Sequence, residues 1–249
     1  MPKDSPLPSR ERVPERSEGG WGARATVSGL EQHTMSDAFR RFEFSFFHDP
    51  KSAQDALDTA SLAALAGDER GRAEDMLIAF LPDSRAVIGL GVLRSKKAAP
   101  ALRLLFDDEL KEQAEVARDA RNRDEWNPLG LLFLARALWL IEPDRRWPLP
   151  AIAVLASAPE WVHRQEAAEA LRVMRTPEAV AALTKALDDA DGLVRFSAAR
   201  GLLALHGLSY DMADIQSMVY RVMAEDAARR DGGKRDVLAA IAGRGVVGP

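Results

Sequence analysis

Residues 167–189 read AAEALRVMRTPEAVAALTKALDD, and residues 86–108 read AVIGLGVLRSKKAAPALRLLFDD. Small, apolar and charged residues match along both stretches at a constant offset, as in the pairs Leu90/Leu171 and Arg94/Arg175. Internal repeats determine the architecture of a chain before local propensity does. The chain is therefore predicted to contain similar structural units that stack on one another.

A second and closer repeat lies in the C-terminal half. Arg164, Ala167, Ala168 and Leu171 return as Arg195, Ala198, Ala199 and Leu202. Between the copies, Thr176 has the character of a helix N-cap and Pro177 that of a first helical residue. Residues 85–94 and 97–106 have helical apolar spacing and predict a helix pair. Because a lone pair cannot bury its apolar face, we expect an all-α fold, a right-handed α-solenoid of stacked antiparallel helix pairs.

The stretch DGLVRFSAARGLLAL, residues 191–205, resembles the HEAT-like repeats, in the short bacterial form also seen in phycobilisome-lyase-related proteins. The likeness covers residues 85–106 and 160–208 and is weaker over residues 108–150. It implies that Asp191 and Arg195 link neighbouring units. It also implies a concave face lined by the second helix of each pair, residues 97–106 and 177–187. The residues expected to be exposed on that face are Arg103, Glu178 and Lys185.

Other elements follow from apolar spacing and from breaking residues. The phenylalanines of residues 39–47 fit either a short strand or a helix start. Further helices are predicted at residues 54–66 (ending at Gly67), 72–81, 108–123, 129–141, 151–156, 211–229 and, after Gly232 and Gly233, 235–242. The last two helices are expected to cap the apolar end of the stack.

Two regions are predicted along the chain. Residues 1–34 are rich in charged residues, Pro, Ser and Gly, and we expect a disordered tail without a secretory signal. Met35 offers a second start, which would make that tail an upstream extension. Residues 35–249 are predicted to form a single HEAT-like α-solenoid domain with terminal capping helices.

Composition excludes several kinds of chemistry. The chain has no cysteine, so disulfides, thiolate zinc sites and cysteine nucleophiles are ruled out, and a cytoplasmic location is expected. None of the four histidines is followed by Glu, the dipeptide that iron-dependent hydroxylases on such repeats use as ligands. We predict no metal, no cofactor and no catalytic residue. The apolar run of residues 129–141 is too short to cross a bilayer and contains Arg136, which argues against a membrane partner.

The predicted function is the binding of another protein, because adaptable surfaces without convergent catalytic groups favour recognition. A bacterial immunity or antitoxin protein is the concrete version. One alternative is a nucleic-acid-processing enzyme of the DNA glycosylase kind, for which Asp144 and four tryptophans are available: Trp126, Trp139, Trp147 and Trp161. The net charge of −4 argues against nucleic acid. The other alternative is a scaffold or regulatory subunit.

Two acidic groups are candidate partner contacts. Asp107 and Asp108 end the first repeated stretch, and Asp188 and Asp189 end the second. They are predicted either to form an acidic ridge that engages a basic surface or to cap helices and solvate turns. With Arg103, Glu178 and Lys185 they complete the predicted partner-binding set. The features particular to this chain are expected where the repeat fails, between residues 107 and 150, and on the neighbouring concave helices.

Overall fold

The structure is a computed structural model that describes residues 35–47, 57–118, 126–209 and 213–246. These residues form twelve helices and no strand, which confirms the predicted all-α class. The predicted tail, residues 1–34, lies outside the described residues. The helices are α1 (Asp37–Phe47), α2 (Thr59–Ala63), α3 (Gly67–Ala79), α4 (Ser84–Val92), α5 (Ala99–Arg118), α6 (Leu129–Ile141), α7 (Pro148–Ser157), α8 (Trp161–Leu171), α9 (Pro177–Ala186), α10 (Gly192–Leu205), α11 (Ala213–Val222) and α12 (Ala227–Ile241).

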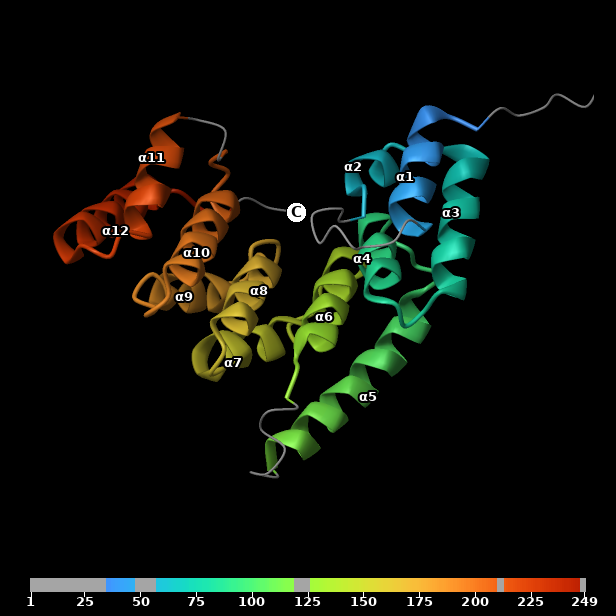
Figure 1. Cartoon of the computed structure of the whole chain (residues 1–249), viewed down its shortest axis with the longest axis horizontal. Helices are drawn as coiled ribbons and strands as arrows, with labels where there is room; N and C mark the ends of the chain where they lie inside the picture. Colours follow the sequence, from blue (N-terminus) through green and yellow to red (C-terminus); the bar gives the residue numbers. More distant parts are fainter. Residues whose placement is uncertain (1–34, 48–56, 119–125, 210–212, 247–249) are drawn as a thin grey trace, which may run out of the picture. The chain divides into compact units, whose positions relative to one another are not determined.

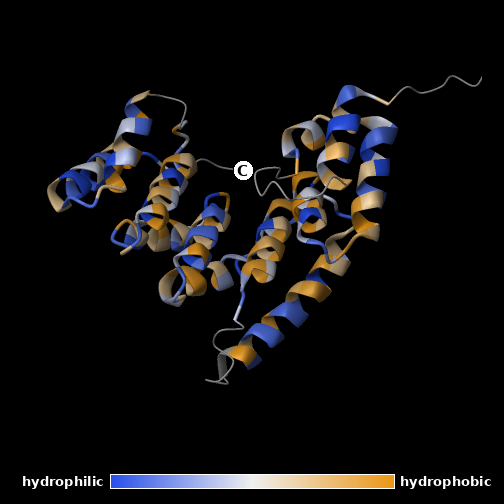
Figure 2. Cartoon of the chain, viewed as in Figure 1, coloured by the Kyte–Doolittle hydropathy of each residue, from blue (hydrophilic) through white to orange (hydrophobic). Residues whose placement is uncertain are grey.

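The helices pack as the pairs of an α-solenoid (Figure 1). In one layer, α4, α6, α8 and α10 each pack against the next. The second layer consists of α5, α7 and α9, which pack against α6, α8 and α10 respectively. The second helices that the sequence analysis selected, residues 97–106 and 177–187, thus correspond to α5 and α9 of this layer. One apolar core runs through the described helices, and Figure 2 shows α6 as mainly hydrophobic.

Short polar side chains start several of these helices. The Asp58, Asp83, Thr176, Asp191 and Asp226 side chains each accept a hydrogen bond from a backbone N–H in the first turn that follows. Those N–H groups have no partner within the helix, so the caps define where the helices begin. Thr176 and Pro177 do as the sequence predicted, with Pro177 at the first helical position.

Residues 39–47, for which the sequence left a strand or a helix start open, are helical throughout α1, which buries Phe39, Phe42 and Phe46 on one face. Two other predicted helices need correction at their ends. The described part of the predicted helix 54–66 is only the short α2, and α3 begins five residues before the predicted position 72. Gly67 has a φ of +52°, a conformation that suits glycine, and is the first residue of α3.

The charged helix predicted separately at residues 108–123 is wrong, because α5 runs unbroken from Ala99 to Arg118. Neither Gly nor Pro interrupts the sequence at Phe106 or Asp107, so the backbone continues. Figure 2 shows the second half of α5 as mostly hydrophilic. The change from apolar to charged sequence therefore marks the point in α5 where the side chains pass from the core to solvent.

The predicted break at Gly232 and Gly233 is also wrong, since both residues lie inside α12. A Cβ atom on Gly233 would lie 2.7 Å from the Val222 backbone nitrogen and 2.8 Å from the Arg221 Cβ. Gly233 therefore permits the close approach of α12 to α11, and α12 continues through the glycine without a break. Gly91 does the same between α4 and α6, where a Cβ would lie 2.8 Å from the Ala137 Cα.

Two equivalent arginines hold the turns between the helix pairs. Arg164 and Arg195 lie at matching positions of α8 and α10, and each uses its Nη1 group to bind the two carbonyl oxygens that precede its helix cap. The distances are 2.9 and 2.8 Å to Ala158 and Pro159, and 2.7 and 2.8 Å to Asp189 and Ala190. The sequence repeat is thus also a repeat of hydrogen bonds.

The same arginines reach forward along the chain. Arg164 forms a bidentate ion pair with Asp189 at 2.8 and 2.9 Å. Arg195 instead donates to the backbone oxygens of Val222 at 2.8 Å and Met223 at 3.0 Å. The link between units that the family resemblance implied is therefore present, but Asp191 only caps its own helix.

Candidate functional site

The predicted acidic residues at the α9–α10 turn are bound within the chain. Asp189 pairs with Arg164, and the two side chains are only 11% and 15% exposed. Burial acts to raise the pKa of Asp189, but the Arg164 guanidinium and the Asp191 N–H outweigh it and hold that pKa below its usual value. Asp188 forms an ion pair with Lys234 of α12 at 2.6 Å. These contacts favour the capping interpretation of this turn over a free acidic ridge.

The acidic residues on α5 are more accessible. Asp107 and Asp108 are exposed, and Asp108 contacts Lys111 at 3.2 Å on the same helix. No hydrogen bond or ion pair in the described part of the chain joins this group to Asp188 or Asp189.

Of the predicted basic contacts, only Lys185 is unengaged. Arg103 forms a bidentate ion pair with Glu142, at the end of α6. The pair raises the pKa of Arg103 and lowers that of Glu142. Lys185 is exposed in the last turn of α9, where a cation is favourable, and has no partner among the described side chains.

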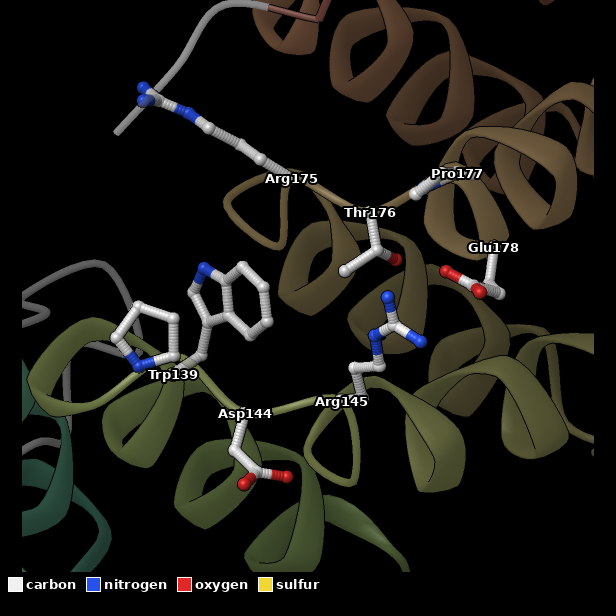
Figure 3. A pocket seen from close by; sticks show the side chains of 8 residues that line it. Trp139, Asp144, Arg145, Arg175, Thr176, Pro177 and Glu178 are labelled. Carbon is white, nitrogen blue, oxygen red and sulfur yellow. The ribbon is translucent and has the colours of Figure 1, made fainter.

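A pocket of about 290 Å³ lies where the loop after α6 meets the start of α9 (Figure 3). The guanidinium of Arg145 points toward Thr176 and the predicted contact Glu178, and the Trp139 indole lies beside it, whereas Arg175 extends away. Arg145 is exposed and forms no hydrogen bond or ion pair within the described residues. The residues that line the pocket are Trp139, Pro143, Asp144, Arg145, Arg175, Thr176, Pro177 and Glu178.

An adjoining groove of about 460 Å³ shares part of this lining and runs over the start of α7. Its apolar residues are Pro148, Leu149 and Ile152, and the Leu149 side chain is 59% exposed. Arg146 covers the ring of the buried Trp147 at 3.9 Å and forms part of the rim. We call the pocket and the groove together the α7–α9 groove. It combines exposed apolar surface with Arg145, an arginine without a partner among the residues that the structure describes.

The tryptophans assigned to the glycosylase alternative do not gather at one place. Trp139 and Asp144 line the same pocket, but Asp144 accepts a hydrogen bond from the Arg146 N–H at 2.9 Å and its carboxylate points away from Thr176 and Glu178. Trp147 is buried against Phe106 and donates to the Glu142 carbonyl oxygen.

A charged cluster crosses the first layer. Glu169 of α8 pairs with Arg172 at 3.0 Å and with Arg200 of α10 at 3.6 Å. Burial, followed by the charge of Glu169, raises the pKa of Glu166. Burial, followed by the charge of Arg172, lowers the pKa of Arg136. The cluster adds charge interactions between α6, α8 and α10 to the apolar contacts that these helices share.

Sequence reasoning did not identify Arg145, Thr176 and Leu149 as residues that line the α7–α9 groove. The available signal was the run of prolines at positions 143, 148 and 150, which interrupts the repeat. Among the described residues, no three His, Asp or Glu side chains are placed to hold a metal ion. Within the same residues, no helix has the length and apolarity needed to cross a membrane.

The fold and its repeated arginines define a helical-repeat protein with stacked helix pairs. Residues 124–228 match a family model described as HEAT repeats, which supports the predicted HEAT-like repeat architecture for this part of the chain. No curated protein and no solved structure matches the chain. HEAT repeats are commonly protein-interaction modules.

Proposed function

We propose that this protein is a non-catalytic protein-binding module that holds its partner in the α7–α9 groove. The observation that carries the proposal is Leu149, 59% exposed beside a groove of about 460 Å³. Exposed apolar residues in a concave site with a polar rim are typical of the centre of a protein interface. Because Arg145 has no hydrogen bond or ion pair with the described residues, the expected occupant is an apolar side chain flanked by a carboxylate.

The experiment compares two matched variants in affinity capture from a lysate of the source cells. Leu149→Asp and Leu193→Asp each replace an exposed leucine at the second position of a helix, α7 and α10 respectively. An acidic residue there is compatible with the helix dipole, so both variants are expected to fold. We expect Leu149→Asp to lower recovery of a specific protein by about tenfold, and Leu193→Asp to leave it unchanged.

Circular dichroism and thermal unfolding of both variants verify that the fold is retained. If the two variants recover every captured protein equally, the proposal that the α7–α9 groove binds the partner is contradicted. A protein recovered by the native chain and lost with Leu149→Asp and with Arg145→Glu would support it.

An immunity or antitoxin role is the narrower form of this proposal. Its support is an analogy: small helical-repeat proteins can bind an enzyme and mask it. Co-expression with a toxin-like product of a neighbouring gene tests it. Growth restored by the native chain and lost with Leu149→Asp is expected, whereas a stable complex without any effect on growth would indicate a scaffold or regulatory subunit.

A nucleic-acid-processing role is the second candidate, because one pocket gathers Trp139, Asp144 and Arg145. Arg145 can contact a phosphate and Trp139 can stack on a base. The test measures binding of a labelled duplex that contains an alkylated base and release of that base. Release abolished by Asp144→Asn would favour the enzyme and contradict the protein-binding proposal. The orientation of the Asp144 carboxylate, away from Thr176 and Glu178, supports protein binding instead.

A further inference from the structure

A second pocket, of about 230 Å³, lies where α4, α5 and α6 meet. Its apolar part includes the buried Val87 and Leu134 and the partly exposed Leu105 and Phe133. The volume equals that of roughly eight water molecules in the liquid. The remaining lining residues are Pro82, Ser84, Asp108, Glu109, Glu112 and Gly130.

One face of α5 supplies the charge of this pocket. Leu105, Asp108, Glu109 and Glu112 are spaced by three, four and seven positions from the first, which places them on the same side of the helix. The lining includes three carboxylates and no basic side chain. The pocket is thus apolar at its base and acidic along one rim.

These carboxylates retain free hydrogen-bonding capacity. The contact of Asp108 with Lys111 joins side chains that are 76% and 72% exposed, and such pairs are weak. Glu109 accepts only a neutral amide, from Gln113 at 3.0 Å. Its carboxylate lies over Gly130, where an added Cβ would be 3.2 Å from its Oε1. Glu112 has no hydrogen bond or ion pair within the described part of the chain.

The structure therefore distinguishes the two acidic groups, which one of the two interpretations of the sequence combined in a ridge. At the α9–α10 turn, Arg164 and Lys234 already neutralise Asp189 and Asp188. On α5 the carboxylates line a pocket, and within the described residues Asp108 and Glu109 have only weak or neutral partners and Glu112 has none. Of the two acidic groups, the α5 group is therefore the one that can engage a cation from outside at the smaller cost in described contacts.

We propose that this pocket binds an arginine side chain of a partner protein. The aliphatic stem would lie on Leu105 and Phe133, and the guanidinium would meet Glu109 and Glu112. Arginine fits better than lysine, because its planar group binds carboxylates in bidentate fashion and stacks on aromatic rings. The proposal rests on protein binding as the function, but it uses a surface other than the α7–α9 groove.

The absence of cysteine from the chain permits a direct test. Ser84→Cys places a unique thiol at the exposed edge of the pocket. The full-length variant is equilibrated with bis(2-guanidinoethyl) disulfide or with its neutral isostere bis(2-ureidoethyl) disulfide, at fixed 2-mercaptoethanol. Intact-mass spectrometry gives the labelled fraction. We expect the equilibrium constant for the guanidinium probe to exceed that for the urea probe by about fivefold.

Glu112→Gln in the Ser84→Cys background should reduce that preference to less than about twofold. Glu115→Gln removes an exposed charge of the same helix outside the pocket lining, and should leave the preference unchanged. Ser157→Cys, an exposed serine of α7, is the control thiol and should show no preference. Thermal unfolding of each variant verifies the fold.

Equal labelling by the two probes at residue 84, or a preference that survives Glu112→Gln, would overturn the proposal. So would an equal preference at residue 157. Either result leaves the capture experiment with Leu149→Asp unaffected. A failed capture experiment together with a guanidinium preference at residue 84 would instead refute the α7–α9 groove and keep the arginine pocket.

Discussion

Replacement of Arg195 tests whether the repeated arginines hold the helix pairs together. The residue is 4% exposed and donates hydrogen bonds to five backbone carbonyl oxygens. Two of those oxygens belong to the turn before α10, and three belong to the end of α11. Arg195→Ala removes all five hydrogen bonds at once and leaves no other donor of that reach.

The magnitude follows from what happens to those oxygens. Val222 is buried, so its carbonyl keeps a desolvation cost of about 1–3 kcal/mol when its donor is lost. The other four residues are partly or fully exposed, and water can replace the donor at a cost of a few tenths of a kcal/mol each. With the lost packing of the aliphatic stem, Arg195→Ala should lower the free energy of unfolding by about 3–4 kcal/mol. Arg195→Lys keeps the charge but not the planar fork, and should recover less than half of that loss.

Urea unfolding followed by circular dichroism measures the total, and amide hydrogen exchange locates it. We expect protection to fall first in α11 and α12, while α6 and α8 keep theirs, because the lost contacts join α10 to α11. A loss below about 1 kcal/mol, or a uniform fall in protection over all helices, would refute the argument that Arg195 links these units.

Three further predictions concern single positions. Arg103→Glu should lower the melting temperature, because it places a second carboxylate beside that of Glu142. Lys185→Glu should lower it less, because Lys185 has no ion pair within the described residues and only its favourable interaction with the C-terminal end of α9 is lost; differential scanning fluorimetry compares the two variants. Glu166→Gln should raise the free energy of unfolding at pH 7 by up to about 1 kcal/mol. Burial raises the pKa of Glu166, so the native state binds a proton at this carboxyl more readily than the unfolded state does. As the pH rises through that pKa, the buried carboxylate becomes charged and the free energy of unfolding falls. Urea titrations at pH 4, where the carboxyl is protonated in the native state, should show no gain from Glu166→Gln. Gly91→Ala should cost about 1–3 kcal/mol by forcing α4 from α6, while Gly71→Ala, with open space around it, should stabilise α3 by up to about 1 kcal/mol in the same urea assay.

The repeat pattern predicted the helix class and most of the central elements. Its success has a physical reason: the matching small and apolar residues are those that the stacked helices bury, as Ala167, Ala168 and Leu171 show. The errors arose where the sequence was read locally. The double glycine resembled a break, but Gly233 is required by the contact with α11. The charged stretch after Phe106 resembled a new element, although it only continues α5 beyond the core.

The candidate surfaces were less predictable, because charge in the sequence does not reveal which charges are already paired. Asp108 and Asp189 look equivalent in the repeat. The structure pairs Asp189 with a buried Arg164, and leaves Asp108 on the edge of an open pocket. The same holds for Arg103, which the sequence placed on a binding face and the structure pairs with Glu142. Pairing depends on contacts across helices, and the spacing along one helix carries no information about them.

The loop after α6 shows how a predicted contact residue can act through its neighbour. Glu142 is held by the Arg103 side chain, and its carbonyl oxygen by the Trp147 indole N–H. The loop is therefore fixed at both ends, which holds the backbone of Arg145 beside the α7–α9 groove. A fixed loop loses less entropy on binding than a mobile one, so this support should increase affinity. If Arg103 acts only by positioning the loop, Glu142→Gln and Arg103→Gln should weaken partner binding equally, and the double variant no further. Additive losses in that cycle would show that Arg103 contacts the partner itself.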